Sequence, residues 1–189
     1  MLKDLIIKNR SYRRFDESKK INQEELLELI ELARLSPSAA NRQPLKYFLS
    51  YSEDNNKLIF STLAWAGYLK DWAGPSQGER PTAYIVILGD KKITDNFGVD
   101  PGIAAQSILL GANEKGLGGC ILGSVSRDEL RDFFNIPSQY EILYVLALGY
   151  PIEKVQLEEI GEDGNIEYWR DEEQVHHVPK RSLSHLIIS

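Results

Sequence analysis

Metal-binding and disulfide-forming residues are scarce in this 189-residue sequence, which has one cysteine and three histidines. A single cysteine, Cys120, cannot form an internal disulfide or an iron–sulfur cluster within the chain, which agrees with the reducing cytoplasm. His176 and His177 are adjacent, so as strand neighbours they would point to opposite faces. We therefore expect no metal site and a cytoplasmic location.

The sequence also lacks a long hydrophobic run and an excess of positive charge. No apolar stretch reaches membrane-spanning length, and charges interrupt the apolar residues of Met1–Lys8, unlike a signal peptide. The net charge of -6 argues against nucleic acid as a partner, because non-specific binding needs Lys and Arg to neutralise phosphates. An anionic ligand would need a local cluster of cations.

Common signatures of nucleophilic and nucleotide chemistry are missing as well. The sequence contains neither a G-x-S-x-G nucleophile elbow nor a P-loop. Cys120 lies in an apolar run with no cation nearby in sequence, which is typical of a buried small residue and not of a nucleophile. No side chain is therefore predicted to be catalytic.

What is present is the pattern of one soluble globular domain, with a length that suits a sizeable core. Asn22 with Glu25 and Ser126 with Glu129 form two candidate capping boxes at helix starts. The unbroken apolar run at 83–88 indicates a strand buried on both faces. The pattern predicts helices over 4–9, 22–36, 55–69, 101–115 and 126–136, and strands over 45–51, 83–88, 120–122 and 142–148.

The C-terminal part, residues 152–189, differs from the rest. It is polar and holds too few apolar residues to build its own core. Glu162-Asp163-Gly164-Asn165 is a turn signal, and a hairpin across it is plausible. We therefore expect a core of residues 1–151 and an extension, 152–189, that packs on this core or on a second subunit.

Two basic segments could bind an anion. Arg10-Ser11-Tyr12-Arg13-Arg14 offers guanidinium groups and a hydroxyl, which match phosphate oxygens, although such a stretch can simply be a solvated basic segment. Lys180-Arg181 could join it around one phosphate or could be surface charge.

Two further segments could approach a planar ligand. The 36–44 loop combines small residues, two prolines and the amides of Asn41 and Gln43, so it is either a ligand loop or an ordinary connection. The glycines of 116–124 do not fit a dinucleotide fingerprint; they allow close approach of a ligand or tight packing of a strand. Trp65, Tyr68 and Trp72 suit a core or interface, with a pocket lid as the alternative.

Together and in this order, these segments resemble the FMN-dependent nitroreductase family. The most specific parts are Arg10-Ser11-x-Arg13-x-Phe15 and Pro37-Ser38-Ala39-x-Asn41-x-Gln43-Pro44, and the resemblance runs from Arg10 to about Leu183. It implies an α+β fold with a mainly antiparallel central sheet flanked by helices. It also implies an intertwined homodimer with FMN at the interface and an extended C-terminal segment that crosses to the partner.

The resemblance also implies roles for particular residues. Phosphate and ribityl contacts correspond to Arg10, Ser11, Tyr12 and Arg13, and the late basic contact corresponds to Arg181 together with Lys180. The loop that reaches the flavin from the other subunit is represented by Pro37, Ser38, Ala39 and Asn41, with Gln43 nearby. Leu122 and Gly123 match a stretch whose backbone passes flavin N5. The family often has Glu-Gly there, so any role of that carboxylate does not carry over to this chain.

The implied activity is ping-pong, two-electron transfer from NADH or NADPH to nitroaromatic, quinone or related small acceptors. The cofactor carries this chemistry, which fits the absence of a catalytic side chain. Two alternatives stay open. One is a specialised flavin enzyme of the same family, for reductive dehalogenation or flavin fragmentation, and the other is a flavin-binding protein without turnover.

Overall fold

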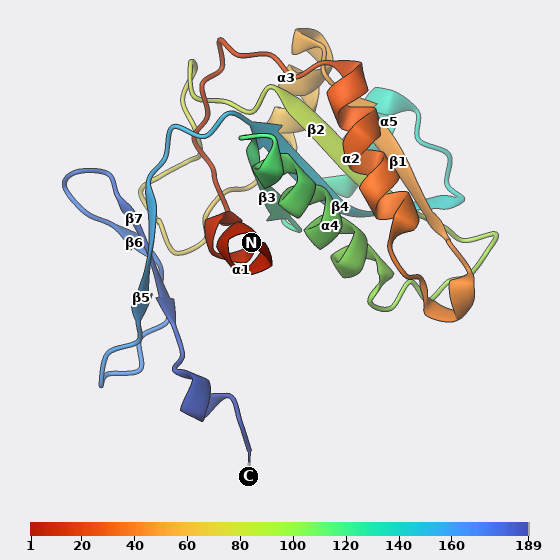
Figure 1. The fold of residues 1–189 in the computed structure, drawn as a ribbon. Helices are drawn as coiled ribbons and strands as arrows, with labels where there is room; N and C mark the ends of the chain where they lie inside the picture. Colours follow the sequence, from red (N-terminus) through yellow and green to blue (C-terminus); the bar gives the residue numbers. More distant parts are fainter. Residues whose placement is uncertain (189) are drawn as a thin grey trace.

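A four-stranded antiparallel sheet forms the centre of the computed structural model, which describes residues 1–188 (Figure 1). The strand order is β1-β2-β4-β3, and each neighbouring pair is antiparallel. The strands are β1 (Leu45–Ser50), β2 (Ala83–Asp90), β3 (Gly118–Leu122) and β4 (Tyr140–Gly149). Helices cover both faces of this sheet, so the predicted α+β class is confirmed.

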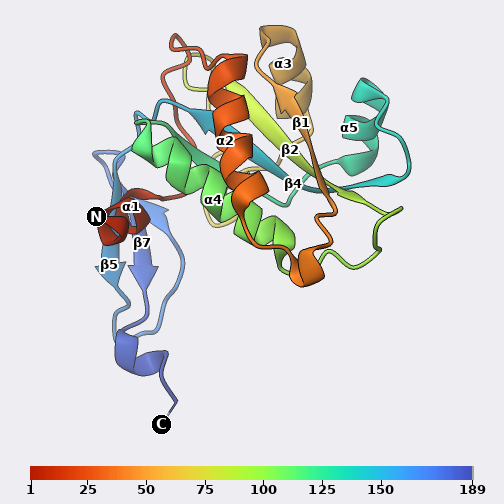
Figure 2. The ribbon, with the colours of Figure 1, turned by 45° about the vertical axis from the view of Figure 1, so that its right-hand side comes forward.

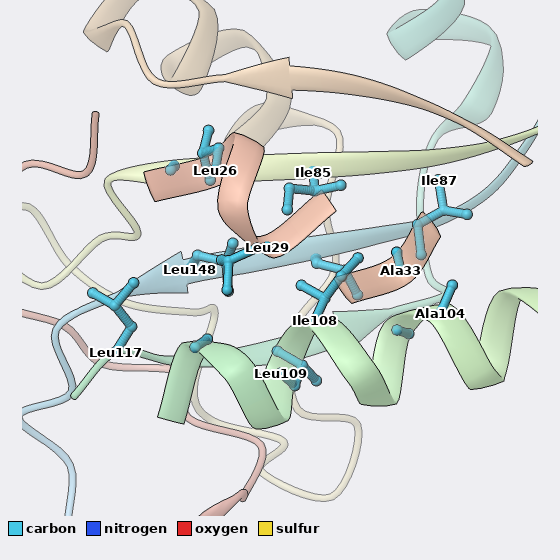
Figure 3. Packing of buried hydrophobic residues seen from close by; sticks show 14 of the residues in the cluster. Leu26, Leu29, Ala33, Ile85, Ile87, Ala104, Ile108, Leu109, Leu117 and Leu148 are labelled. Carbon is cyan, nitrogen blue, oxygen red and sulfur yellow. The ribbon is translucent and has the colours of Figure 1, made fainter. Parts of the chain in front are cut away.

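One face of the sheet packs against α2 (Gln23–Leu35) and α4 (Asp100–Glu114), which lie side by side across it (Figure 2). Ile85 and Ile87 of β2 meet Leu29 of α2 and Ile108 of α4 in the core cluster shown in Figure 3. All four of these side chains are fully buried. Removing such apolar surface from water is the main stabilising contribution of the layer.

The alternate residues of β2 face the opposite layer. Tyr84 and Val86 pack with Ile59 of α3 (Glu53–Ser61) and Leu130 of α5 (Arg127–Phe134). Because both sets of alternating side chains are buried, every residue of β2 is buried. The prediction of a strand covered on both faces is therefore confirmed.

Helix boundaries follow the sequence signals only in part. The Asn22–Glu25 capping box is confirmed, with bonds of 3.0 and 2.9 Å. The Ser126 box is wrong, since its side chain makes no cap bond and its backbone N–H donates to the Thr62 carbonyl instead. The predicted 55–69 helix ends at Ser61, because the next residues pair with the 124–126 segment.

The C-terminal extension forms a small second sheet that lies beyond the main sheet and beside α1 (Leu2–Lys8) in both views (Figures 1 and 2). Its strands are β5 (Val155–Glu159), β6 (Trp169–Arg170) and β7 (His176–Lys180), in the order β5-β7-β6. The predicted hairpin across 162–165 is wrong, because β5 pairs in parallel with β7 and not with β6. The hairpin instead joins β6 to β7, and Asp171 accepts a bond from the Val175 N–H in its turn.

Two 3-10 turns, Ala39–Asn41 and Leu183–His185, complete the regular elements. None of the helices described by the structure has the length and apolar character that crossing a bilayer requires.

Candidate functional site

The basic N-terminal segment lies along the edge strand β3. Ser11 pairs with Gly119 in a parallel bridge, and the Tyr12 N–H donates to the Gly119 carbonyl at 3.0 Å. A Cβ added at Gly118 would lie 2.6 Å from the Tyr12 ring, and one at Gly119 would lie 2.6 Å from the Ala147 carbonyl oxygen. These glycines therefore serve tight packing, and this packing fixes the basic segment against the sheet.

A pocket of about 300 Å³, called the first pocket below, opens between this segment and β7. It brings together the early and late basic segments, 170 residues apart in sequence, within one chain. No acidic side chain lines it. The lining residues are Asn9, Arg10, Ser11, Arg13, Tyr168, His176, Val178 and Lys180, and Arg181 is not among them.

Two arginines of the first pocket, Arg10 and Arg13, each have an N–H donor without an acceptor in the described part of the chain. Arg13 is 8% exposed; its Nη1 donates to the Ser11 carbonyl at 3.1 Å and contacts His176 Nε2 at 3.3 Å. Arg10 Nη2 donates to the Ile6 carbonyl at 2.6 Å. The Nε of each arginine is buried and has no acceptor among residues 1–188. Burial lowers the pKa of Arg10, yet a guanidinium stays charged at any physiological pH.

The two histidines lie on opposite faces of β7, as predicted. His176 is buried, and burial together with Arg13 and Arg170 lowers its pKa to about 4, so it is neutral at pH 7. His177 lies 3.1 Å from both Glu158 and Asp171, and the bond to Asp171 is the main cause of its raised pKa. Within the described 1–188 range, no group of three His, Cys, Asp or Glu side chains could hold a metal ion.

A second pocket of about 210 Å³ adjoins the first, and Arg13 lines both. Leu122 and Gly123 form part of its wall, and Arg13 is the one charged residue that lines it. A Cβ added at Gly123 would approach nothing closer than 3.8 Å, so this position does not need glycine for packing. The other lining residues are Ala64, Trp65, Ala66, Gly67, Cys120, Ile121 and Ser124.

Cys120 also lines the second pocket, but its thiol is not activated as a nucleophile. It is 2% exposed, and burial raises the pKa of its thiol. The thiolate is the reactive form, so a protonated thiol agrees with the predicted absence of a protein nucleophile.

The 37–43 loop lies elsewhere, at the N-terminal end of α4 (Figure 2). Ser38 Oγ donates to Asp100 Oδ2 at 2.6 Å, and the Ala39 N–H donates to Asp100 Oδ1 at 2.9 Å. Ala40, Asn41 and Gln43 all have a left-handed backbone, with φ of 51°, 52° and 51°. Such conformations are strained for residues other than glycine, so the loop depends on its anchors.

Asp100 is one residue that the sequence analysis did not single out. It is 4% exposed, and it begins the 15-residue helix α4. An acidic residue directly before Pro101 at a helix start was the available signal, because carboxylates are favourable at helix N-termini. A pocket of about 250 Å³ beside it is lined by Pro37, Ser38 and Gln43, and it shares no lining residue with the first two pockets.

α4 separates this loop from the first pocket. The loop is anchored to Asp100 at the start of α4, whereas Asn9 of the first pocket donates to Gln106 Oε1 at 3.3 Å further along the helix, and Ser11 pairs with β3 beyond its C-terminal end. One chain therefore does not bring the 37–43 loop to Arg10 and Arg13.

Two members of the basic segment point away from the first pocket. Tyr12 Oη donates to the Lys8 carbonyl at 2.9 Å, so its role as a cofactor contact stays a prediction. Arg14 forms a two-pronged ion pair with Glu79, with bonds of 2.9 and 2.5 Å. Of the three clustered arginines, two are left for an anion.

The aromatic residues expected as core or lid lie in and beside the second pocket. Trp65 is 8% exposed and lines this pocket. Tyr68 packs on Tyr168 with ring centres 4.9 Å apart, and the Arg170 guanidinium lies 4.3 Å from the centre of the Trp72 ring. These residues thus connect one pocket wall to the C-terminal extension.

Comparison with known proteins identifies the family. The Nitroreductase family model matches residues 6–150. This chain belongs to the nitroreductase family. An Archaeoglobus fulgidus protein with the provisional name NADH dehydrogenase/NAD(P)H nitroreductase is 28% identical over 155 residues, 78% of this chain and 83% of that protein.

One further relative and one solved structure are also similar to this chain. Iodotyrosine deiodinase of Thermotoga neapolitana is 26% identical over 170 residues, 80% of this chain and 89% of that protein. The structure of an FMN-dependent nitroreductase from Clostridium difficile superposes with a TM-score of 0.64 at 23% identity, over 79% of this chain and 87% of that chain. The latter likeness shows that this nitroreductase-family chain has the family fold.

Proposed function

We propose that this protein is an FMN-dependent oxidoreductase that uses NADH or NADPH to reduce nitroaromatic, quinone or related acceptors, in the cytoplasm. The observation that carries the proposal is the first pocket, cationic and free of acidic lining residues, joined through Arg13 to a largely uncharged second pocket. The family membership and the names of the relatives support the same chemistry.

The residues of the first pocket fit a phosphate. Arg10, Arg13 and Lys180 supply positive charge, and Ser11 adds a neutral donor. The two buried Nε–H groups without acceptors are what phosphate oxygens would satisfy, since charge-assisted bonds of this kind are among the stronger ones in proteins. A guanidinium fork matches phosphate geometry better than an ammonium does.

The second pocket would then receive the ring of the cofactor. When bound, FMN supplies two-electron redox chemistry at its ring. The chain would bind and orient that ring with residues 120–124, which include Leu122 and Gly123, and with Trp65 and its neighbours, since both segments line the pocket. The Cys120 thiol is protonated, and Arg13 is the one charged residue of the described chain that lines the pocket. An acceptor in the pocket would therefore meet no side chain that attacks it as a nucleophile.

The 37–43 loop belongs to this proposal through a second copy of the chain. Its Asn41 and Gln43 do not reach the first pocket of their own chain, so we assign them to the pocket of a partner in a homodimer. Exposed apolar side chains near the C-terminus, Leu183, Leu186 and Ile187, support an extension that packs on another subunit. Truncation before Val155 is expected to give a monomer by sedimentation; a stable truncated dimer that retains flavin would contradict this assignment.

The test of the activity is direct. The purified protein, reconstituted with FMN and kept free of oxygen, is mixed with NADH or NADPH while the flavin absorbance is followed. We expect bleaching with at least one nucleotide and recovery on addition of a quinone or a nitroaromatic. No bleaching with either nucleotide would contradict the oxidoreductase and leave a flavin-binding protein without turnover.

A second candidate is reductive dehalogenation, favoured by the similarity to iodotyrosine deiodinase across 89% of that protein. Iodide release from iodotyrosine by the dithionite-reduced protein would support it. Recovery of flavin absorbance with quinones and none with iodotyrosine would exclude it. Flavin fragmentation would instead appear as permanent loss of the flavin spectrum in air.

A further inference from the structure

Residues 64–67 line the second pocket, and the segment 64–72 that begins with them is called the wall loop below. It is neither helix nor strand, and its own backbone bonds are few: Ala64 N–H to the Ser124 carbonyl, Leu69 N–H to the Ala66 carbonyl and Trp72 N–H to the Leu69 carbonyl. Ala66 has a left-handed backbone with φ of 41°. The position of this loop therefore depends on what packs against it.

Tyr168 of the C-terminal extension packs against both the wall loop and the first pocket. Its ring centre lies 4.9 Å from the Tyr68 ring centre and 4.9 Å from Arg13 Cζ. On another side it contacts the His176 ring at 5.1 Å. Its hydroxyl accepts a bond of 3.4 Å from the Tyr68 N–H, and the residue itself lines the first pocket.

A parallel connection runs through a buried ion pair. Arg170 lies over the Trp72 ring at 4.3 Å and donates to Glu153 Oε1 at 2.5 Å. The side chain of Glu153 is fully buried, and its other oxygen accepts the Arg13 backbone N–H at 2.8 Å. Arg13 is thus joined to the wall loop at Tyr68 through Tyr168 and at Trp72 through Glu153 and Arg170.

We propose that Tyr168 is a positioning residue that couples an occupied phosphate pocket to an ordered wall loop. A phosphate in the first pocket would restrain the Arg13 guanidinium through charge-assisted bonds. Because that guanidinium lies against the Tyr168 ring, the ring is restrained too, and Tyr68 gains a fixed partner. The inference rests on the proposed function, since it takes the phosphate of FMN as the occupant.

The chain offers matched variants for this idea. Y168F keeps the ring that touches Arg13 and Tyr68 and removes the 3.4 Å hydroxyl bond alone. Y168L removes the aromatic contacts. Trp169 is the control, because it stacks on His177 with ring centres 4.1 Å apart and does not line the first pocket.

The experiment measures amide hydrogen exchange of residues 64–72 in the full chain, saturated either with FMN or with riboflavin, which lacks the phosphate. For the wild type and Y168F we expect exchange about fivefold or more slower with FMN, as for an ordinary coupling between sites. For W169L we expect the same difference. In Y168L we expect the difference between the two flavins to disappear although FMN still binds, because the remaining connection through Glu153 begins at the Arg13 backbone N–H and not at the guanidinium that would hold the phosphate.

A purely structural role for Tyr168 gives another pattern. In that case Y168L exchanges faster by the same factor with both flavins, and this outcome overturns the coupling. An equal exchange rate with FMN and riboflavin in the wild type also overturns it while leaving the proposed function intact. Failure of the wild type to bind FMN at all would overturn the proposed function itself, and the coupling with it.

Discussion

The first pocket and the 37–43 loop are the two parts of the predicted flavin site, and they lie in different parts of the fold. The first pocket is completed within one chain, because backbone pairing of Ser11 with Gly119 places the basic segment beside β7. The loop is anchored by one carboxylate, Asp100, at the other end of α4. Under the proposed function, the difference teaches that the phosphate pocket is complete within a single chain, whereas the loop would reach the flavin only of a partner chain.

Arg13→Ala tests the first part and has the largest expected effect. It removes a phosphate contact of about 1.5–3 kcal/mol, so FMN affinity should fall by about tenfold to a hundredfold in a fluorescence titration. Riboflavin affinity should change far less. Arg14→Ala is the matched control: it breaks the ion pair with Glu79 and lowers the melting temperature but leaves FMN affinity unchanged. Equal losses in both variants would contradict the division of roles.

Lys180→Met and Arg181→Met sharpen the same comparison. Both residues were predicted as late basic contacts, and only Lys180 lines the first pocket. We expect a loss of FMN affinity of about tenfold for Lys180→Met, from one charge-assisted contact, and a smaller loss for Arg181→Met. The reverse order would mean that residue 181, and not residue 180, turns toward the phosphate.

Asp100→Asn tests the second part. The amide keeps the size of the side chain but not its charge, so the bonds to Ser38 Oγ and the Ala39 N–H weaken by about 1 kcal/mol in total. We expect faster hydrogen exchange in residues 37–43 and a modest, few-fold loss of flavin affinity. Proteolysis at the loop would report the same loosening. No change in loop exchange would show that Asp100 is not its anchor.

His176→Gln has the smallest expected effect, confined to acid pH. The pKa of His176 is lowered to about 4 in the folded protein, so the buried imidazole stays neutral there. Its contribution to the stability of the fold is therefore fully present above the unfolded pKa of about 6.5. That contribution is lost as the pH falls from about 6.5 toward 4. The melting temperature of the wild type should drop over this window, and the variant should drop less. Parallel curves would exclude His176 as the group responsible.

Much of the fold could be predicted because its signals are local. Hydrophobic runs mark β2 and β4, and Asn22 with Glu25 marks the start of α2. The errors arise where tertiary contacts override local signals. Thr62 and Leu63 pair with the 125–126 segment instead of continuing α3, and the wrong hairpin in the extension reflects β7 inserting between β5 and β6.

The site could be predicted in its residues but not in its assembly. Resemblance to the family pointed to Arg10, Arg13 and Lys180, and the structure brings these three together. Nothing local in the sequence shows that Arg14 is neutralised by Glu79 or that Asp100 anchors the loop, because both pairs join residues more than sixty positions apart. Tyr168 was missed for the same reason.

A mixed dimer tests the central claim most directly. One chain carries Arg13→Ala, the other carries Asn41→Ala with Gln43→Ala, and different tags on the two chains allow the mixed dimer to be isolated. If each site combines the first pocket of one chain with the 37–43 loop of its partner, one site contains both defects and the other contains none. The account predicts one tightly held FMN per mixed dimer and little in either parent. A mixed dimer that retains no more FMN than its parents would contradict it.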